Sequence, residues 1–402
     1  MPVSKRKWVD DSNPQDALAK MKADENLQKL NIAAQIAKIP PMHTNDNPLW
    51  QGPCNSGELG GITQSMLVRF LSCRERFRLK YILGLEPPDK WNKGFGYGNM
   101  WHICEEMHAK NGEWDAHLEA YTIEQLRKYP FQREEINKWY NVCRVQFPEY
   151  VKYWSEHSDV MDRVPLMQEK VFDIAYKLPS GRVVRLRGKF DSVDLIEGGV
   201  YLQENKTKGE IDKERIERQL KFDLQTMLYL VALERYETHD PPKIGLLDRN
   251  IKDYPIRGVR YNVIRRPLSG GVGNIRPHSA KSTKTKFTPA ETEEEFYERL
   301  RREYIADDPG YWFFRVRAEI SAQDIMVFRN TCLDPLLEQL CWWYDELGNR
   351  HGSYPFPRMN YRTPFGVWSA LEEDGATEYD SYMATGSESG LRRVETMFTE
   401  LQ

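Results

Sequence analysis

Two stretches of alternating polar and apolar residues, 183–196 and 200–206, are separated only by the turn residues Glu197-Gly198-Gly199. Alternation with a period of two is typical of β-strands, and a short glycine-containing break between two such runs is typical of a β-hairpin. The period of a hairpin also determines which side chains share a face. This segment therefore constrains the fold and the chemistry of the chain more than any other.

Three charged residues of the hairpin fall on one face whichever two-residue turn joins the strands. Glu204 and Lys206 are two residues apart, so both side chains leave the same face. A turn at Glu197-Gly198 places Asp191 opposite Glu204. A turn at Gly198-Gly199 places it opposite Lys206 instead. Both turns predict that two carboxylates and one lysine lie together.

Two neighbouring carboxylates repel each other unless a cation lies between them. A hard divalent cation such as Mg2+ prefers oxygen ligands, and Lys206 beside it would orient water or offset charge on a phosphate. This arrangement is typical of phosphodiester hydrolysis. From spacing alone, a solvated hairpin face with alternating charges is an equally good interpretation.

The periodicity of the whole chain predicts an α/β (α+β) fold with a mixed central sheet flanked by helices. Helical patterns cover 63–84 (capped by Thr63 or Ser65), a segment from about Gly98 that carries Trp101 and His102, and 133–158, 213–237 and 321–347. Strand patterns cover 170–178, 183–196, 200–206, 258–264 and 311–318.

Composition predicts three regions. We expect residues 1–60 to form a partly disordered N-terminal arm or linker with a helix at 17–39. Residues 61–370 form the main domain with a basic loop at 267–290, and residues 371–402 form an acidic tail.

Charge and cysteine content exclude several classes of protein. The 57 basic and 60 acidic residues give a net charge of −3, which excludes a polybasic disordered tail protein. No run approaches the roughly 18 apolar residues of a membrane helix, and no apolar run follows the basic N-terminal residues as in a secretory signal. Six cysteines do not resemble a disulfide framework. We expect a cytoplasmic protein (host cytoplasm if phage-encoded) with free thiols and no membrane partner.

Four motifs in sequence order resemble the PD-(D/E)XK nuclease superfamily. Asp191, Glu204-Asn205-Lys206 and the pair Gln225 and Tyr229 resemble its D…(D/E)xK…QxxxY series. Residues 98–105 resemble the GxxxHxxE helix of its RecB-like branch, which includes the AddAB and CRISPR-associated nucleases. Residues 65–77 resemble the S-x-L…C-x-x-x-F entry helix of that branch. The resemblance covers about 62–235, extends more weakly to about 370, and implies a restriction-endonuclease-like core with helical N-terminal additions.

The resemblance implies roles for individual residues. Asp191, Glu204 and Lys206 would be catalytic, and His102, Asp191, Glu204 and the backbone carbonyl of Asn205 would bind Mg2+ or Mn2+. Gln225 and Tyr229 would support the site, since residues four apart share one face of a helix.

Two other residues near these motifs are left without a role. His108 is an alternative ligand without motif support, although a lone histidine on an apolar helix is commonly a packing residue. Glu169 also resembles an acidic position of the family, and we assign it no role.

The cysteines depart from the family pattern. Many RecB-like nucleases hold a four-cysteine iron–sulfur cluster, with one ligand in the entry helix and three near the C-terminus. Cys73 matches the first ligand, but residues 354–373 contain no cysteine. Cys332 and Cys341 lie nine residues apart in a predicted helix, which is poor geometry for one cluster. We therefore expect core thiols at both positions and no iron–sulfur cluster.

Basic residues gather in two segments that predict a path for nucleic acid. Residues 254–290 contain eight Lys/Arg and no Asp or Glu, and the entry helix is also basic. The expected contacts are Arg69, Arg76, Arg265, Arg266, Lys281, Lys284 and Lys286. The acidic segment 371–402 is expected to avoid DNA.

Together these features predict a metal-dependent DNA nuclease, and the resemblance implies an exonuclease acting on single strands or ends in DNA recombination, repair or phage DNA processing. The chain has no Walker motif, so ATP-driven unwinding would require a helicase or recombination partner. One alternative is a catalytically silent DNA-binding or scaffold module with a nuclease fold, but Asp191, Glu204 and Lys206 are all present. Another is an enzyme acting on a small phosphorylated substrate, for which the long basic loop is superfluous. Exonuclease versus endonuclease action, polarity and DNA versus RNA preference stay open.

Overall fold

The computed structural model describes residues 61–72, 74–110, 112–156, 163–220, 222–235, 254–269, 275–283 and 286–349, and, near the C-terminus, 381–382, 385, 387–394, 398 and 401. The predicted N-terminal arm and its helix at 17–39 lie outside these residues, as do Cys73, Lys284 and the segment 354–373.

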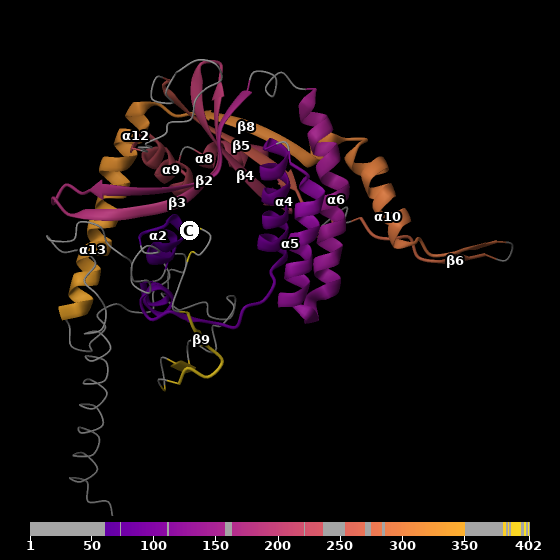
Figure 1. The fold of residues 1–402 in the computed structure, drawn as a ribbon, viewed down its shortest axis with the longest axis horizontal. Helices are drawn as coiled ribbons and strands as arrows, with labels where there is room; N and C mark the ends of the chain where they lie inside the picture. The colour runs from indigo at the N-terminus through magenta and orange to yellow at the C-terminus, as the bar shows by residue number, and fades with distance from the viewer. Residues whose placement is uncertain are drawn as a thin grey trace, which may run out of the picture.

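A five-stranded mixed sheet forms the centre of the fold (Figure 1). Its strands, in spatial order, are β2 (Arg163–Lys177), β3 (Val183–Ile196), β4 (Gly199–Lys208), β5 (Ile256–Arg265) and β8 (Phe313–Glu319). Strands β4 and β5 are parallel, and the other neighbours are antiparallel. The predicted fold class, a mixed sheet flanked by helices, is confirmed.

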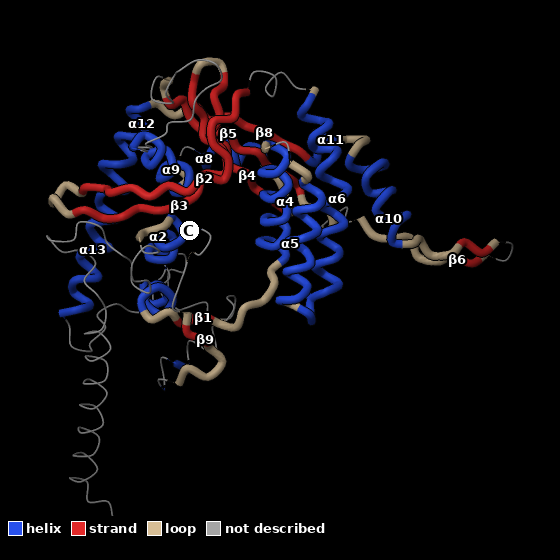
Figure 2. The backbone as a smooth tube through the Cα atoms, in the orientation of Figure 1, coloured by secondary structure: helices blue, strands red, loops and turns tan. Residues whose placement is uncertain are grey.

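Helices cover both faces of the sheet (Figures 1 and 2). One layer contains α2 (Gln64–Ser72), α8 (Lys213–Leu220), α9 (Leu224–Arg235), α12 (Ala322–Phe328) and α13 (Asp334–Asn349). The other contains α4 (Lys93–Ala109), α5 (Trp114–Lys128) and α6 (Arg133–Ser155), with α10 (Glu293–Arg299) against α6. Val193, Leu202 and Val263 belong to the core under the first layer, whereas Ile264 and Phe313 belong to the core under the second. The sheet thus separates two hydrophobic cores.

Shorter elements complete the chain. They are α3 (Arg74–Phe77), the π-helical turns η2 (Arg78–Ile82), η5 (Leu300–Ile305) and η6 (Arg329–Leu333), the 3-10 turn η3 (Pro130–Gln132), α11 (Pro309–Trp312), and the short strands β1 (Leu85–Glu86), β6 (Lys281–Ser282), β7 (Phe287–Thr288) and β9 (Arg392–Arg393).

Several predicted boundaries differ from the structure. Helix α4 begins at Lys93 rather than near Gly98, because the Asn92 side chain caps it by accepting from the backbone N–H of Gly94 and Phe95. Strand β2 begins at Arg163, seven residues before the predicted 170.

The single helix predicted for 213–237 is divided into two helices, α8 and α9. Helix α9 has its own start, since Asp223 accepts from the backbone N–H of Thr226 at 2.9 Å. Helix α5 was not predicted, and Tyr311, predicted as strand, lies in α11.

The turn between β3 and β4 selects one of the two predicted registers. Ile196 pairs with Gly199, so the loop consists of Glu197 and Gly198. Both have left-handed backbone angles, with φ of +51° and +77°, as a two-residue turn with the twist of a hairpin requires. The register therefore places Asp191 opposite Glu204.

A small clasp joins distant parts of the chain. Strand β1 pairs with β9, and the Val394 N–H donates to the Gly84 carbonyl at 2.7 Å. The ring of Phe398 stacks on Tyr81. The described part of the acidic segment 371–402 thus packs against the entry helix region.

The prediction that Cys332 and Cys341 are both core thiols is wrong for Cys332. Cys341 is buried, but Cys332 is exposed. Nine helical residues place two side chains about half a turn apart, so both cannot face one core. Among the described residues, no helix combines the length and the apolarity that spanning a membrane requires.

The sheet also contains a buried ion pair. Asp194 and Arg260 have no exposed side-chain surface, and the Arg260 guanidinium lies 3.0 Å from Asp194 Oδ2. Arg163 Nε lies 2.9 Å from the same oxygen, and the Ser192 hydroxyl donates to Asp194 Oδ1 at 2.7 Å. Asp194 therefore neutralises positive charge that water does not reach.

We expect Asp194→Ala to lower the free energy of unfolding by about 3–5 kcal/mol, because it removes the carboxylate that pairs with the buried charge of Arg260. Glu298→Ala is the control, since Glu298 is half exposed in its ion pair with Arg301, and its loss should lower the free energy of unfolding far less. Urea denaturation measures both. Equal effects of the two substitutions would contradict this account of the buried pair.

Candidate metal centre and active site

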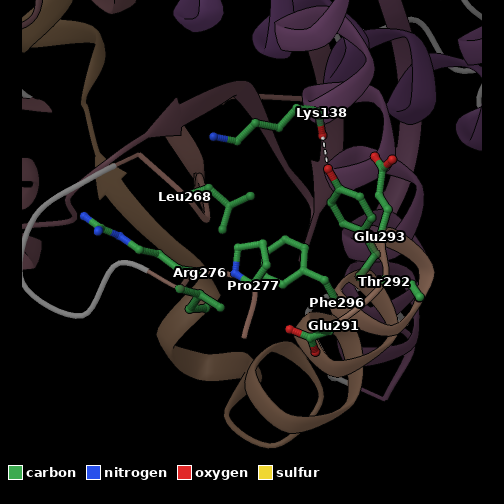
Figure 3. Close-up of a pocket in the computed structure, with 10 residues that line it drawn as sticks. Lys138, Leu268, Arg276, Pro277, Glu291, Thr292, Glu293 and Phe296 are labelled. Atoms are coloured by element: carbon green, nitrogen blue, oxygen red, sulfur yellow. Dashed lines mark hydrogen bonds between the residues drawn. The ribbon is translucent and has the colours of Figure 1, made fainter. Parts of the chain in front are cut away.

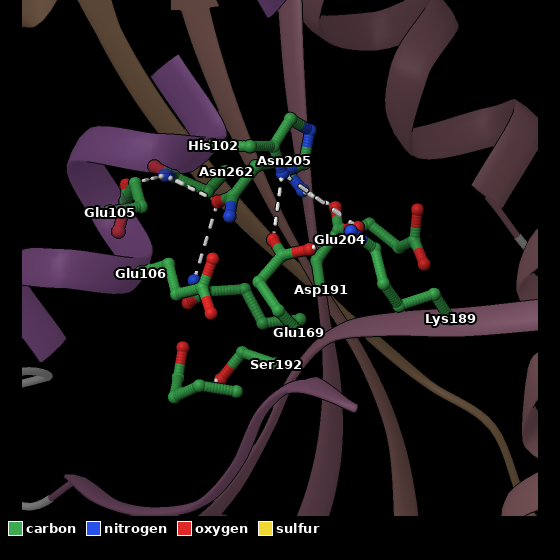
Figure 4. Close-up of polar contacts among 12 residues, drawn as sticks. His102, Glu105, Glu106, Glu169, Lys189, Asp191, Ser192, Glu204, Asn205 and Asn262 are labelled. Atoms are coloured by element: carbon green, nitrogen blue, oxygen red, sulfur yellow. Dashed lines mark hydrogen bonds and ion pairs between the residues drawn. The ribbon is translucent and has the colours of Figure 1, made fainter. Parts of the chain in front are cut away.

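Three acidic side chains stand in one row across β2, β3 and β4. The pairing of their neighbours places Glu169 opposite Asp191, and the hairpin register places Asp191 opposite Glu204. Figure 4 shows the three carboxylates side by side. Carboxylates so close together require a compensating cation.

His102 reaches this row from α4, in the helical layer on the opposite face of the sheet from α9. Its Nδ1 lies 3.1 Å from Glu169 Oε1 and 3.9 Å from Asp191 Oδ1. One ligand atom from each of these three residues lies within 4.8 Å of the others, so a single ion can contact all three. His108, the alternative from the sequence, packs its ring against Phe147 instead.

The charge on His102 responds to these neighbours. Burial opposes protonation, but the charge of Asp191 and the hydrogen bond and charge of Glu169 outweigh it and raise the pKa of His102 to about 9. Without a metal ion, a protonated imidazole and the Lys189 amine therefore both stabilise this pair of carboxylates.

Glu204, Lys206 and Gln225 form a closed triangle beside the row. Lys206 Nζ donates to Glu204 Oε2 at 2.8 Å and to Gln225 Oε1 at 3.0 Å, and Gln225 Nε2 donates to Glu204 Oε2 at 2.9 Å. The other carboxylate oxygen, Glu204 Oε1, is buried and has no hydrogen-bond partner in the described part of the chain. Burial, together with the charge of Asp191, raises the pKa of Glu204 to about 7 despite Lys206.

Tyr229 lies one turn after Gln225 on α9 and packs between Phe172 and Phe190. Burial raises its pKa well above the usual value. Tyr229 therefore borders the triangle from the hydrophobic side.

Asn205 connects the row to the helical layer of His102. Its backbone N–H donates to Asp191 Oδ2 at 2.8 Å, and its side-chain Oδ1 accepts from Asn262 Nδ2 at 2.8 Å. The same Asn262 nitrogen lies 3.1 Å from Glu105 Oε1 on α4, one turn after His102 (Figure 4). A buried amide thus ties α4 to the strand that carries Glu204 and Lys206.

The sequence interpretation left Glu169 out of the site. Glu169 interrupts the alternation of β2 with a left-handed backbone, φ +47°, a few residues after a register shift between Pro165 and Met167. Irregular strand residues of this kind re-aim side chains next to active sites. Lys189 Nζ lies 2.6 Å from Glu169 Oε2 and steadies it. The only signal in the sequence was the acidic family position itself.

The residues present fit a hard divalent cation. Two carboxylates and one imidazole, from Glu169, Asp191 and His102, converge, and beside them Glu204 Oε1 has no hydrogen-bond partner among the described residues. Mg2+ and Mn2+ prefer such oxygen-rich sets.

The basic residues predicted to contact nucleic acid are not gathered in one place. Arg265 lies at the end of β5, where its guanidinium stacks 4.0 Å from the Tyr311 ring, and Arg266 follows it. Lys281 and Lys286 are exposed on the β6–β7 hairpin, which projects away from the sheet (Figure 1). Arg69 lies on α2, and the side chain of Arg76 is outside the described residues.

A family model described as the PD-(D/E)XK nuclease superfamily matches residues 62–327, more than half of the chain. This span contains His102, the acidic row, Lys206 and Gln225. No curated protein matches the chain.

We expect Mn2+ to raise the melting temperature of the chain by several degrees, because an ion that binds only the folded state stabilises it. Asp191→Asn should abolish the shift by removing the central carboxylate of the row. Glu197→Gln is the control, since this exposed carboxylate lies on the turn of the same hairpin. A thermal melt with and without Mn2+ tests this, and an undiminished shift in Asp191→Asn would place the ion elsewhere.

Proposed function

The chain belongs to the PD-(D/E)XK nuclease superfamily, and on this basis we propose that it is a deoxyribonuclease that hydrolyses phosphodiester bonds with Mg2+ or Mn2+. The observation that carries the proposal is the position of Glu204. One of its oxygens is held by Lys206 and Gln225, and the other is buried next to Asp191 and has no hydrogen-bond partner among the described residues. This is the arrangement expected of a carboxylate that binds a metal ion on one side and orients a catalytic lysine on the other.

In this proposal the ion is held by His102, Glu169, Asp191, Glu204 Oε1 and the backbone carbonyl of Asn205. When bound, the ion supplies a Lewis acid that offsets negative charge on the phosphate. The Asn205 N–H supports the site by fixing Asp191 Oδ2. Lys189 supports it by holding the second oxygen of Glu169.

We assign Lys206 the role of a hydrogen-bond donor that keeps its proton. Burial disfavours its charge, but the charges of Glu204 and Asp191 outweigh burial and raise the pKa of Lys206. The protonated amine can therefore orient the attacking water and offset charge that grows on the phosphate. Gln225 keeps Lys206 in place through Oε1, and Tyr229 in turn interacts with the Gln225 side chain.

We further propose that the chain belongs to the RecB-like branch and acts as an exonuclease on single strands or DNA ends, in recombination, repair or phage DNA processing. The motif at 98–105 supports the assignment to this branch, since its histidine, His102, lies 3.9 Å from Asp191. Unwinding would come from a helicase or recombination partner. The proposed DNA contacts are Arg69, Arg76, Arg265, Arg266, Lys281, Lys284 and Lys286.

Digestion of end-labelled DNA with Mg2+ or Mn2+ tests the proposal. We expect Lys206→Ala to lower the cleavage rate by about 100- to 1,000-fold, the usual effect of removing one charge-stabilising donor. Asp191→Ala should abolish detectable cleavage. Lys177→Ala is the matched control, because Lys177 is an exposed lysine of the same sheet at the far end of β2.

Linear single-stranded, linear double-stranded and circular DNA are compared in the same assay. Sparing of the circles would agree with an exonuclease, and cutting of circles would assign an endonuclease. If the wild-type chain binds DNA but cuts none of these substrates with either metal, the proposed enzymatic function is wrong. An equal loss of cleavage rate in Lys177→Ala would contradict the catalytic role assigned to Lys206.

A further inference from the structure

A second group of cations lies where the parallel strands β4 and β5 end. Lys208 and Arg265 are register partners at this edge, and the Arg266 N–H donates to the Lys208 carbonyl at 2.7 Å. In open α/β sheets, ligands bind outside the carboxyl ends of parallel strands. Lys208 also follows Lys206 by two residues on β4, so this edge adjoins the proposed active site.

Arg266 has no anionic partner among the described residues. Its Nε is buried without a hydrogen-bond partner, and burial lowers the pKa of its guanidinium, opposed only by the Tyr97 hydroxyl. A partly buried guanidinium without an acid is unfavourable. The position therefore favours an anion that the described residues do not supply.

Two glycines leave the Arg266 guanidinium uncovered. A side-chain Cβ at Gly94 would lie 3.4 Å from Nη1, and one at Gly209 would lie 3.8 Å from Nη2. Gly209 also passes close to Ser269, whose hydroxyl is buried and lacks a partner in the part of the chain that is described. Because Nε and the Ser269 hydroxyl are buried, the Nη1 and Nη2 donors of the partly exposed Arg266 side chain are the groups available to a phosphate, which offers only acceptors at neutral pH.

Lys208 adds positive charge at the same corner. Its side chain is exposed, and the pKa of its amine is lowered by partial desolvation and by the like charges of Lys206 and Arg215, against the opposing charge of Asp223. Like charges that lie close together favour an anion between them. The first N–H groups of α4 do not contribute, because Asn92 already caps them.

The hollow between α6 and α10 is a weaker candidate (Figure 3). Its acidic residue Glu291 accepts hydrogen bonds from Nε and Nη2 of Arg299 at 2.7 and 2.8 Å. Glu293 is bound by Asn141. These groups are satisfied within the chain and show no preference for a ligand.

We propose that Arg266 and Lys208 bind a backbone phosphate of the DNA strand, next to the phosphate that the metal centre cleaves. The assignment rests on the proposed nuclease function for the identity of the strand, but phosphate binding itself needs no metal ion. Arg266 supplies a planar pair of donors, and Lys208 supplies a point charge. The two residues thereby hold the strand in register with Lys206.

Fluorescence anisotropy of a labelled oligothymidine in EDTA tests the subsite without cleavage. We expect Arg266→Gln to weaken binding about tenfold, as loss of a charge-assisted hydrogen bond does. It should also reduce the slope of log K against log salt by roughly 0.7, the value for one phosphate of a single strand. Lys208→Gln should reduce the slope similarly with a smaller loss of affinity.

Arg266→Lys separates charge from geometry: it should keep the salt slope of the wild type but lose affinity, because it cannot present two parallel donors. Arg133→Gln is the control, since Arg133 is exposed at the start of α6. If Arg266→Gln fails to fold in a thermal melt, Arg266→Lys and Lys208→Gln carry the test.

Wild-type binding in both Arg266→Gln and Lys208→Gln would overturn the subsite, as would an equal loss in Arg133→Gln. Failure of the nuclease proposal gives a different result. In that case the wild-type chain does not cut DNA with either metal, while the loss of binding in the Arg266 and Lys208 variants persists in EDTA.

Discussion

The two-residue turn at Glu197 and Gly198 is the constraint on which the candidate site depends. Side chains alternate along a strand. A slip of one residue in this hairpin would therefore move Asp191 to the other face of the sheet, away from Glu204. Both turn residues have left-handed backbones, and Glu197 accepts this without being glycine. The backbone cost at one exposed residue maintains the row from Glu169 to Glu204 and, through it, the position of Lys206.

The site also depends on two layers that have separate cores. The acidic row and Lys206 belong to the sheet, whereas His102 comes from α4, which packs in the other hydrophobic cluster. Asn262 is the polar link between them, since its side-chain nitrogen contacts both Glu105 and Asn205. The metal-ligand geometry is therefore a property of how the two layers are joined, and not of the hairpin alone.

The alternating pattern predicted the strand β3 to the residue and the correct face for Asp191, Glu204 and Lys206, because local periodicity determines these features. It could not place Glu169, since β2 becomes irregular there and its left-handed residue disrupts the alternation. Helix α5 was missed because only Leu118 and Thr122 are buried along it, which is too little apolar surface for a helical period. The roles of the site residues stay predictions, and the approach of His102 to Asp191 depends on tertiary packing that no local pattern encodes.

The pairing of β1 with β9 has a consequence for the order in which this protein acquires its structure. The Arg392 guanidinium contacts Glu86 across 306 positions of sequence. During synthesis on a ribosome, the entry helix region and the sheet can assemble long before β9 emerges. The strand partner of β1 leaves the exit tunnel 306 residues after β1 does, so this part of the molecule is completed long after the entry helix region has been synthesised.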